Sequence, residues 1–264
     1  MRIVGLGDSY LFGWGVRQGA GVLEQLTARL AERHADVRWE AVNTAVPGYN
    51  TAMEVEMLAD RALAFDPDLV VLDWVRNDVD LPNFLWRPRS LFGLGESFAL
   101  TAARKRVAGL PALGFPIVEA PLGDRGREYQ SDPARVPAEY RYMVGVEGVR
   151  GALERLVGLR AAHGFELVIT AHARVPPRIE EVFTSLDVPF VRCRDALNAY
   201  ASSHGTSTRP GSPLTVSATD PHLSELGHGV CAGAYAAELA SSGLDERLVA
   251  RARRGSGRGR TSRR

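Results

Sequence analysis

Apolar and polar positions along the chain follow two periods, which together predict strands and helices in regular alternation. Short, nearly continuous apolar runs are typical of strands buried in a parallel sheet. Longer segments with apolar residues every three to four positions are typical of amphipathic helices. The apolar runs predict five short strands, over about residues 3–6, 37–42, 69–72, 165–170 and 188–191.

Helical periodicity fills most of the sequence between these strands. It predicts helices over about residues 19–34, 55–65, 149–163 and 178–186, and a closing helix that ends near Ser241. Strands that alternate with helices favour a three-layer α/β/α domain around a five-stranded parallel sheet. Prolines and glycines interrupt residues 80–145, which we interpret as an insertion: either a lid over a site or a segment packed on the sheet.

Composition is that of one folded α/β domain. The chain has 264 residues, of which 45% are hydrophobic and 24% charged, and this excludes global disorder. No apolar run approaches the roughly 18 residues of a membrane span. Because the first strand begins at Arg2, it leaves no room for a removable signal peptide, and we expect a cytoplasmic protein. Cys193 and Cys231 are too few for a disulfide framework or a metal cluster, so we expect buried free thiols.

The charge is unevenly distributed although the net charge is only +1. Residues 247–264 hold eight arginines and no acidic residue, in a sequence rich in glycine and serine. Such a composition predicts a disordered tail after a domain that spans residues 1–246. The tail is either a solvated end or a weak nucleic-acid-binding accessory, and a nucleic-acid partner is not expected for the domain.

The first strand ends in Gly7-Asp8-Ser9, which places Ser9 at the carboxyl edge of the sheet, where α/β proteins bind ligands. Ser9 is open to two interpretations, a turn or helix-capping residue or a nucleophile. A dinucleotide-binding turn is excluded, because the G-x-G-x-x-G pattern that starts at Gly5 has Tyr10 in its third glycine position.

Three further polar sites follow strands or precede the last helix, so a parallel sheet would bring them to the edge that holds Ser9. They are Gly48 in a dense turn sequence, Asn77 after the third strand, and Asp220 with His222 before the closing helix. Each alone is typical of a turn or cap. Together they suggest the nucleophile, base, acid and oxyanion donors of acyl chemistry.

This set of motifs resembles that of the SGNH hydrolases, also called the GDSL esterase/lipase family, over most of the chain. Gly7-Asp8-Ser9 is similar to the family's first sequence block, the loop around Gly48 to its second, and Asn77 to its third. The last block is represented by Asp220-Pro221-His222. Two positions depart from the usual pattern: Val75 replaces a glycine, and Leu223-Ser224 replaces Pro-Asn.

The resemblance implies the flavodoxin-like SGNH fold and a role for each residue. Ser9 would be the nucleophile, His222 the general base and Asp220 the group that orients the imidazole. The N–H groups of Ser9 and Gly48 and the side-chain amide of Asn77 would form the oxyanion hole. No metal or organic cofactor is required by this chemistry.

These roles predict a serine esterase that acts on a carboxylic ester with a small or medium acyl chain, such as an acyl group on a sugar or metabolite. Two alternatives stay open at this point. The same residues could transfer the acyl group to a hydroxyl acceptor instead of water, or the fold could serve as a non-catalytic binding protein. The expected partner is a small-molecule ester, and the sequence leaves the oligomeric state open.

Overall fold

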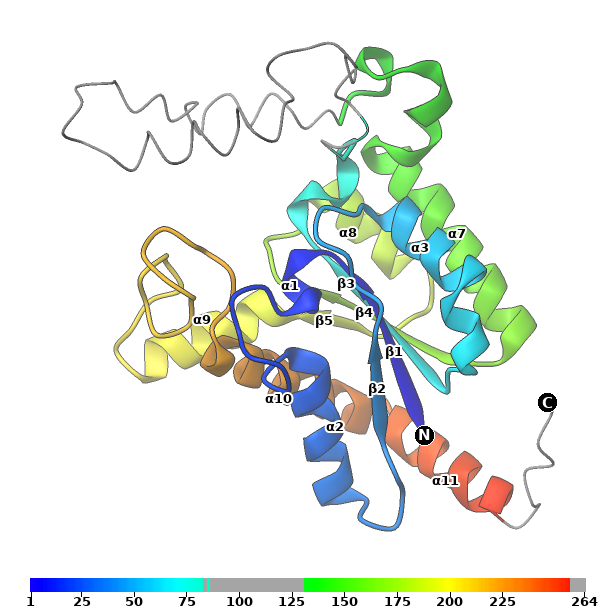
Figure 1. Cartoon of the computed structure of the whole chain (residues 1–264), viewed down its shortest axis with the longest axis vertical. Helices are drawn as coiled ribbons and strands as arrows, with labels where there is room; N and C mark the ends of the chain where they lie inside the picture. The colour runs from blue at the N-terminus through cyan, green and yellow to red at the C-terminus, as the bar shows by residue number, and fades with distance from the viewer. Residues whose placement is uncertain (83–84, 86–130, 257–264) are drawn as a thin grey trace, which may run out of the picture.

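The computed structural model describes residues 1–82, 85 and 131–256, and these form a parallel sheet between two layers of helices (Figure 1). The five strands lie in the order β2-β1-β3-β4-β5 and all pairs are parallel. Their bounds are β1 Arg2–Gly7, β2 Glu40–Asn43, β3 Leu69–Trp74, β4 Glu166–Ala171 and β5 Phe190–Arg192. The predicted three-layer α/β/α class and its flavodoxin-like strand order are confirmed.

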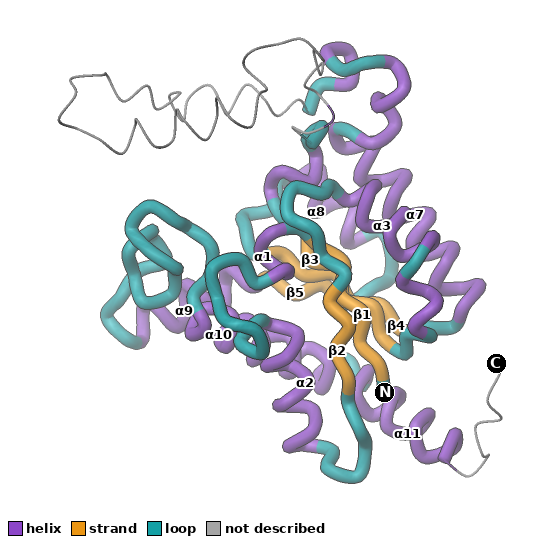
Figure 2. Tube along the Cα trace, viewed as in Figure 1, coloured by secondary structure: helices purple, strands orange, loops and turns teal. Residues whose placement is uncertain are grey.

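Helices cover both faces of the sheet, as the tube in Figure 2 shows. On one face lie α3 (Thr51–Asp60), α7 (Gly145–His163) and α8 (Pro177–Thr184). On the other lie α2 (Val22–Arg33), α9 (Cys193–Ser203), α10 (Glu225–Ser241) and α11 (Leu244–Ser256). Shorter elements are α1 (Ser9–Phe12) and the 3-10 helices η1 (Ala62–Phe65), η2 (Arg76–Val79), η5 (Pro133–Arg135) and η6 (Ala138–Met143).

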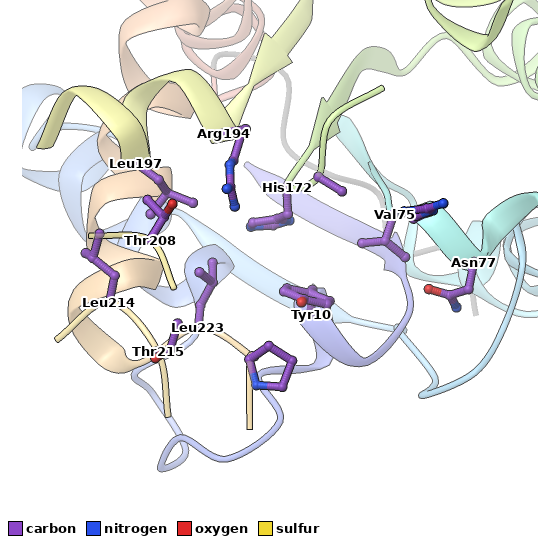
Figure 3. A pocket seen from close by; sticks show the side chains of 13 residues that line it. Tyr10, Val75, Asn77, His172, Arg194, Leu197, Thr208, Leu214, Thr215 and Leu223 are labelled. Carbon is purple, nitrogen blue, oxygen red and sulfur yellow. The ribbon is translucent and has the colours of Figure 1, made fainter. Parts of the chain in front are cut away.

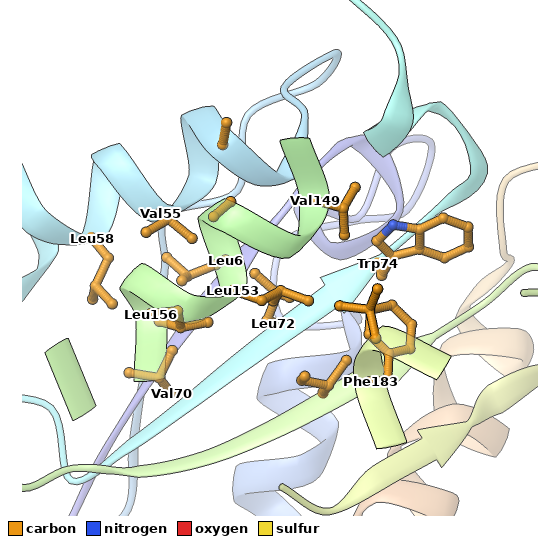
Figure 4. Packing of buried hydrophobic residues seen from close by; sticks show 14 of the residues in the cluster. Leu6, Val55, Leu58, Val70, Leu72, Trp74, Val149, Leu153, Leu156 and Phe183 are labelled. Atoms are coloured by element: carbon orange, nitrogen blue, oxygen red, sulfur yellow. The ribbon is translucent and has the colours of Figure 1, made fainter. Parts of the chain in front are cut away.

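Each face of the sheet has its own apolar core, because successive strand residues point to opposite faces. Leu6 and Leu72 pack under α3 and α7 (Figure 4), whereas Ile3 and Val71 pack under α2 and α10. These side chains are fully buried, and each contributes roughly 1.5–3 kcal/mol of hydrophobic stabilisation. The two cores fix the sheet on both sides, so its carboxyl edge is a rigid platform.

Two strands at the centre define that edge. β1 and β3 are neighbours, but the strand that follows β1 in the sequence, β2, lies on one side of them, and the strand that follows β3, β4, lies on the other. Such a reversal of direction opens a crevice between the carboxyl ends of the two strands. The segments that follow β1 and β3, which include Ser9 and Asn77, therefore begin at the same crevice.

Several element bounds differ from those predicted. The helix expected over 55–65 begins at Thr51 and breaks at Arg61 into η1, and the second strand begins at Glu40. The helix α9 was not predicted at all. Its buried face consists of Cys193, Leu197 and Ala201, and only one of these is a large aliphatic residue.

The prediction of a disordered tail from residue 247 is wrong for residues 247–256, which continue α11. Leu248 and Val249 are almost completely buried and anchor this arginine-rich helix to the core under α10. Arg253 pairs with Asp36 at 2.9 Å. Residues 257–264 and most of the proposed insertion, 86–130, lie outside the described residues. Within the part of the chain that the structure describes, no helix is both long and apolar enough to span a bilayer.

Candidate active site

Ser9 begins α1 directly after β1, and the local sequence fixes this sharp change of direction. The Asp8 side chain caps the short helix, because its Oδ1 accepts a hydrogen bond from the Tyr10 N–H at 2.9 Å. Gly7 is required for the close approach of α1 to β1, since a Cβ at this position would lie 2.7 Å from the Leu11 Cβ. The Ser9 hydroxyl is thereby held at the crevice.

The loop from Leu214 to Ser224 brings the second half of the site to the same place. An antiparallel bridge between Thr215 and Leu223 closes the loop, and the Val216 N–H donates to the His222 carbonyl at 2.8 Å. Ser224 ends the loop as the N-cap of α10. This small hairpin fixes the backbone on both sides of Asp220 and His222.

Asp220 and His222 of this loop form a continuous chain of hydrogen bonds with Ser9 of α1. His222 Nε2 lies 2.8 Å from Ser9 Oγ, and His222 Nδ1 lies 2.6 Å from Asp220 Oδ1. The same carboxylate oxygen accepts the His222 backbone N–H at 3.0 Å, so the acid and the imidazole are locked together. Both side chains are part-exposed, at 21% for His222 and 28% for Asp220, which leaves them accessible to a substrate.

The carboxylate of Asp220 is stabilised in its charged form. Burial raises its pKa, but the hydrogen bonds from the His222 N–H and ring together outweigh this and lower the pKa below its usual range. Trp14 also lowers the pKa of Asp220, and its ring lies beside His222 with 6.2 Å between the ring centroids. Trp14 is a site residue that the sequence analysis missed, although a tryptophan in a glycine-rich turn, 48% exposed, is an unusual surface residue.

Asn77 and Gly48, the expected oxyanion donors, come from the ends of β3 and β2. The Asn77 side-chain N–H donates to Asp8 Oδ2 at 3.2 Å, which fixes the plane of the amide and leaves its second N–H for another acceptor. Gly48 occupies the third position of a turn closed by a 3.0 Å hydrogen bond from the Tyr49 N–H to the Val46 carbonyl. Its φ of 85° is the conformation that a type II turn requires and glycine readily adopts.

The sequence model of the GDSL-like Lipase/Acylhydrolase family matches residues 6–230, most of the chain. The chain belongs to this family. The match includes Ser9, Asn77 and His222, and the resemblance found from the motifs is therefore confirmed. As a GDSL-like enzyme the protein is a carboxylic ester hydrolase.

Solved structures with the same fold are similar over nearly their whole length. A variant of a Geobacillus acetyl-xylooligosaccharide esterase has a TM-score of 0.52 and 15% identity, with 90% of this chain and 93% of that chain covered. The psychrotrophic esterase EstA from Pseudoalteromonas has a TM-score of 0.52 and 10% identity, covering 91% and 97%.

An α/β hydrolase from the Lake Arreo metagenome has a TM-score of 0.51 and 17% identity, with 90% of this chain and 94% of that chain covered. At these identities the likeness shows the fold. No curated protein matches the sequence of this GDSL-like enzyme.

A cavity of about 210 Å³ adjoins the catalytic hydrogen-bond chain of the GDSL-like enzyme (Figure 3). Asn77 lies at one side of it, and Tyr10 and Pro221, the chain neighbours of Ser9 and His222, form part of its wall. The Tyr10 ring contacts the His222 ring, with 4.8 Å between centroids. The cavity therefore lies directly beside the hydrogen-bond chain of Ser9, His222 and Asp220.

A second histidine–carboxylate pair lies behind the Tyr10 ring. His172 Nδ1 is 2.7 Å from Asp73 Oδ2, and both side chains are almost completely buried. Burial lowers the pKa of His172, but the Asp73 carboxylate more than compensates, so the pKa is raised well above its usual range. Thr170 and Tyr235 donate to the other Asp73 oxygen at 2.6 and 3.1 Å. His172 was a candidate pocket residue, and its ring does line the cavity.

The two cysteines meet at this buried pair although they are far apart in sequence. Ligand atoms of His172, Cys193 and Cys231 lie within 4.8 Å of one another, and among the described residues this is the group that has the donors for a soft metal ion. Both thiols are buried and unoxidised, and burial raises the pKa of Cys193 well above its usual range. His228, on the same helix as Cys231, is also buried, and burial lowers its pKa to about 4.

A pair of buried carboxyl groups lies on the opposite face, under α3. Asp78, which follows Asn77 in the sequence, is fully buried and accepts a hydrogen bond from Thr51 at 3.0 Å. Glu54 is also buried, and neither of its carboxyl oxygens has a hydrogen-bond partner in the described structure. Burial, and then neighbouring carboxylates, raise the pKa of both groups well above the usual range, so at least one proton is held here.

Proposed function

We propose that this GDSL-like enzyme is a serine esterase that hydrolyses a small or medium carboxylic ester through an acyl-enzyme intermediate. The observation that carries the proposal is the unbroken chain from Ser9 Oγ through His222 to Asp220, with contacts of 2.8 and 2.6 Å. Ser9 Oγ also lies 3.2 Å from Asp8 Oδ2, but its single proton is better directed to the shorter contact with His222.

In the proposed reaction, His222 takes the proton from Ser9 Oγ as this oxygen attacks the ester carbonyl carbon. Asp220 holds the ring orientation and stabilises the imidazolium that forms. The tetrahedral oxyanion is stabilised by the N–H groups of Ser9 and Gly48 and by the Asn77 amide, whose plane Asp8 fixes.

The imidazolium then protonates the leaving alcohol oxygen. His222 next removes a proton from water as the water attacks the acyl carbon, and the imidazolium returns this proton to Ser9 Oγ as the acid is released. The 2.8 Å contact between His222 Nε2 and Ser9 Oγ supports a single base for both half-reactions.

The test is hydrolysis of p-nitrophenyl esters from acetate to dodecanoate by the wild-type enzyme and by Ser9→Ala. We expect kcat to fall by roughly 10⁴- to 10⁶-fold in the variant, because the nucleophile is removed. Ser203→Ala is the matched control, since Ser203 is an exposed serine at the end of α9 and should leave the rate unchanged.

Equal rates in wild type and Ser9→Ala would refute Ser9 as the nucleophile. Release of p-nitrophenol that depends on an added alcohol and yields the new ester would instead identify acyl transfer by the same residues. The lengths of the acyl chains accepted would also measure the space beside Ser9.

A further inference from the structure

The cavity beside the catalytic chain has a size that limits what it can hold. Its volume is about 210 Å³. One water occupies roughly 30 Å³ in the liquid, so the space fits roughly seven water-sized groups, the size of a short chain. Apolar side chains of Val75, Leu197 and Leu223 line part of the wall and suit methylene groups.

Two arginines are among the residues that line the cavity. They are Arg76 and Arg194, and none of the described residues that line it is an Asp or Glu. Arg76 directly precedes Asn77, and Arg194 lies in the first turn of α9. In Figure 3 the Arg194 side chain extends from this helix toward the centre of the lining residues, close to the His172 ring.

Other charges do not neutralise Arg194. The imidazole of His172 is already balanced by the carboxylate of Asp73 at 2.7 Å. Asp80 lies near Arg76. Burial raises the pKa of Asp80 to about 6, and the charge of Arg76 partly opposes this rise. For Arg194, the described part of the chain contains no carboxylate within ion-pair distance. Burial and then the carboxylates of Asp8, Asp220 and Asp73 raise the pKa of the Tyr10 hydroxyl at the cavity wall, and the charge of Arg194 partly opposes this rise.

The two threonines of the cavity are less suited to ligand recognition. Thr215 Oγ1 accepts the Gly211 N–H at 3.0 Å and lies 3.2 Å from the Ser212 carbonyl, and Thr208 Oγ1 contacts Asn198 at 3.4 Å. Their hydroxyls thus hold the loop together. The two arginines are the cationic donors among the lining residues, and the planar fork of a guanidinium group matches a carboxylate.

We propose that the cavity binds a carboxylate that is joined to the scissile ester by a short chain, with Arg194 as its main specificity residue and Arg76 as a second positive charge. This inference rests on the proposed esterase function. It narrows the substrate from any small ester to the half-ester of a short dicarboxylic acid, or to an acyl ester of a short hydroxy acid. The two classes place the same carboxylate on opposite sides of the ester bond.

The test compares matched esters that differ only in charge. For the acyl side, these are p-nitrophenyl hydrogen glutarate and the analogue with an isopropyl group in place of the carboxylate. For the alcohol side, they are the acetate ester of a four-carbon hydroxy acid and its isopropyl analogue, with released acetate measured. We expect kcat/KM for the charged member of one pair to exceed that of its neutral partner by about tenfold or more, as for a charge-assisted hydrogen bond.

Arg194→Gln should remove this preference, because kcat/KM should fall about tenfold further for the charged ester than for its neutral partner. Arg192→Gln is the matched control: Arg192 is exposed, pairs with Glu180, and does not line the cavity. The wild type gives a second readout, since added NaCl should raise KM for the charged ester alone.

Two results would overturn the inference while leaving the esterase function intact. One is equal kcat/KM for the charged and neutral members of both pairs, and the other is an equal loss of kcat/KM for the charged and the neutral ester in Arg194→Gln. Absence of hydrolysis for every ester would refute the proposed function itself, and the inference with it.

Discussion

The GDSL-like enzyme contains two histidine–carboxylate pairs of almost the same length that differ in their surroundings. The pair His222–Asp220 is part-exposed, lies in a surface loop and has Ser9 Oγ at 2.8 Å from the second ring nitrogen. The pair His172–Asp73 is almost completely buried and lies at the ends of two central strands. The Tyr10 ring stands between them and contacts both imidazoles.

The difference shows that contact with a carboxylate alone does not make a histidine a base. His172 keeps its proton, because Asp73 stabilises the imidazolium and raises its pKa, so it cannot accept another. Its neighbours are thiols and the Tyr10 and Tyr235 rings. His222 has a hydroxyl in contact and faces the substrate side. In the proposed mechanism the exposed pair therefore carries the proton, whereas His172 of the buried pair is part of the cavity wall.

Of the two pairs, the exposed one should have the larger effect on the reaction rate when its carboxylate is replaced. In Asp220→Asn the amide cannot stabilise the imidazolium and favours the wrong tautomer, and we expect kcat to fall by roughly 10³- to 10⁴-fold. The measurement is kcat on the best p-nitrophenyl ester, with thermal unfolding as a check on the fold. Asp187→Asn, an exposed aspartate in a turn that asparagine tolerates, is the control. A loss below about threefold would mean that Asp220 does not orient the base.

The members of the exposed pair were predictable from the sequence because local motifs contain them. Asp220 and His222 are two residues apart, and Ser9 and Asn77 each follow an apolar strand at the carboxyl edge. The buried pair was not predictable, since Asp73 lies in β3 and His172 directly follows β4, and only the pairing of these two strands brings them together. The same applies to Trp14, whose ring lies beside His222 although the two residues come from distant loops.

Replacing the carboxylate of the buried pair should act on stability instead. Asp73→Asn leaves His172 without its counter-charge inside the core, and we expect the free energy of unfolding to fall by about 3 kcal/mol. Urea denaturation measures this change. Asp36→Asn removes an exposed pair with Arg253 and should leave stability close to that of the wild type. If the two variants were equally stable, the buried pair would make no net contribution to the fold.

Fold class was readable from apolar periodicity, and the errors fall where this signal is weak. In α11, the apolar residues Leu248 and Val249 are buried in a segment that is otherwise rich in arginine. In α9 the buried face uses Cys193 and Ala201, which a pattern of large aliphatic residues does not count. In both cases packing against α10 supplies the stability that the local sequence does not indicate.

Glu54 sharpens the comparison, because it is a buried carboxyl group without the cation that Asp73 has. Its pKa is raised from 4.5, chiefly by burial, so the folded state keeps a proton that the unfolded state loses. Stability that depends on this proton is present below about pH 4.5 and declines as the pH rises toward the folded pKa. We expect Glu54→Gln to reduce the fall in the free energy of unfolding between about pH 5 and pH 8 by about 1 kcal/mol. Glu56→Gln, on the same helix but in a surface pair with Arg155, should keep the wild-type slope, and identical slopes in all three proteins would show that Glu54 ionises at its usual pKa.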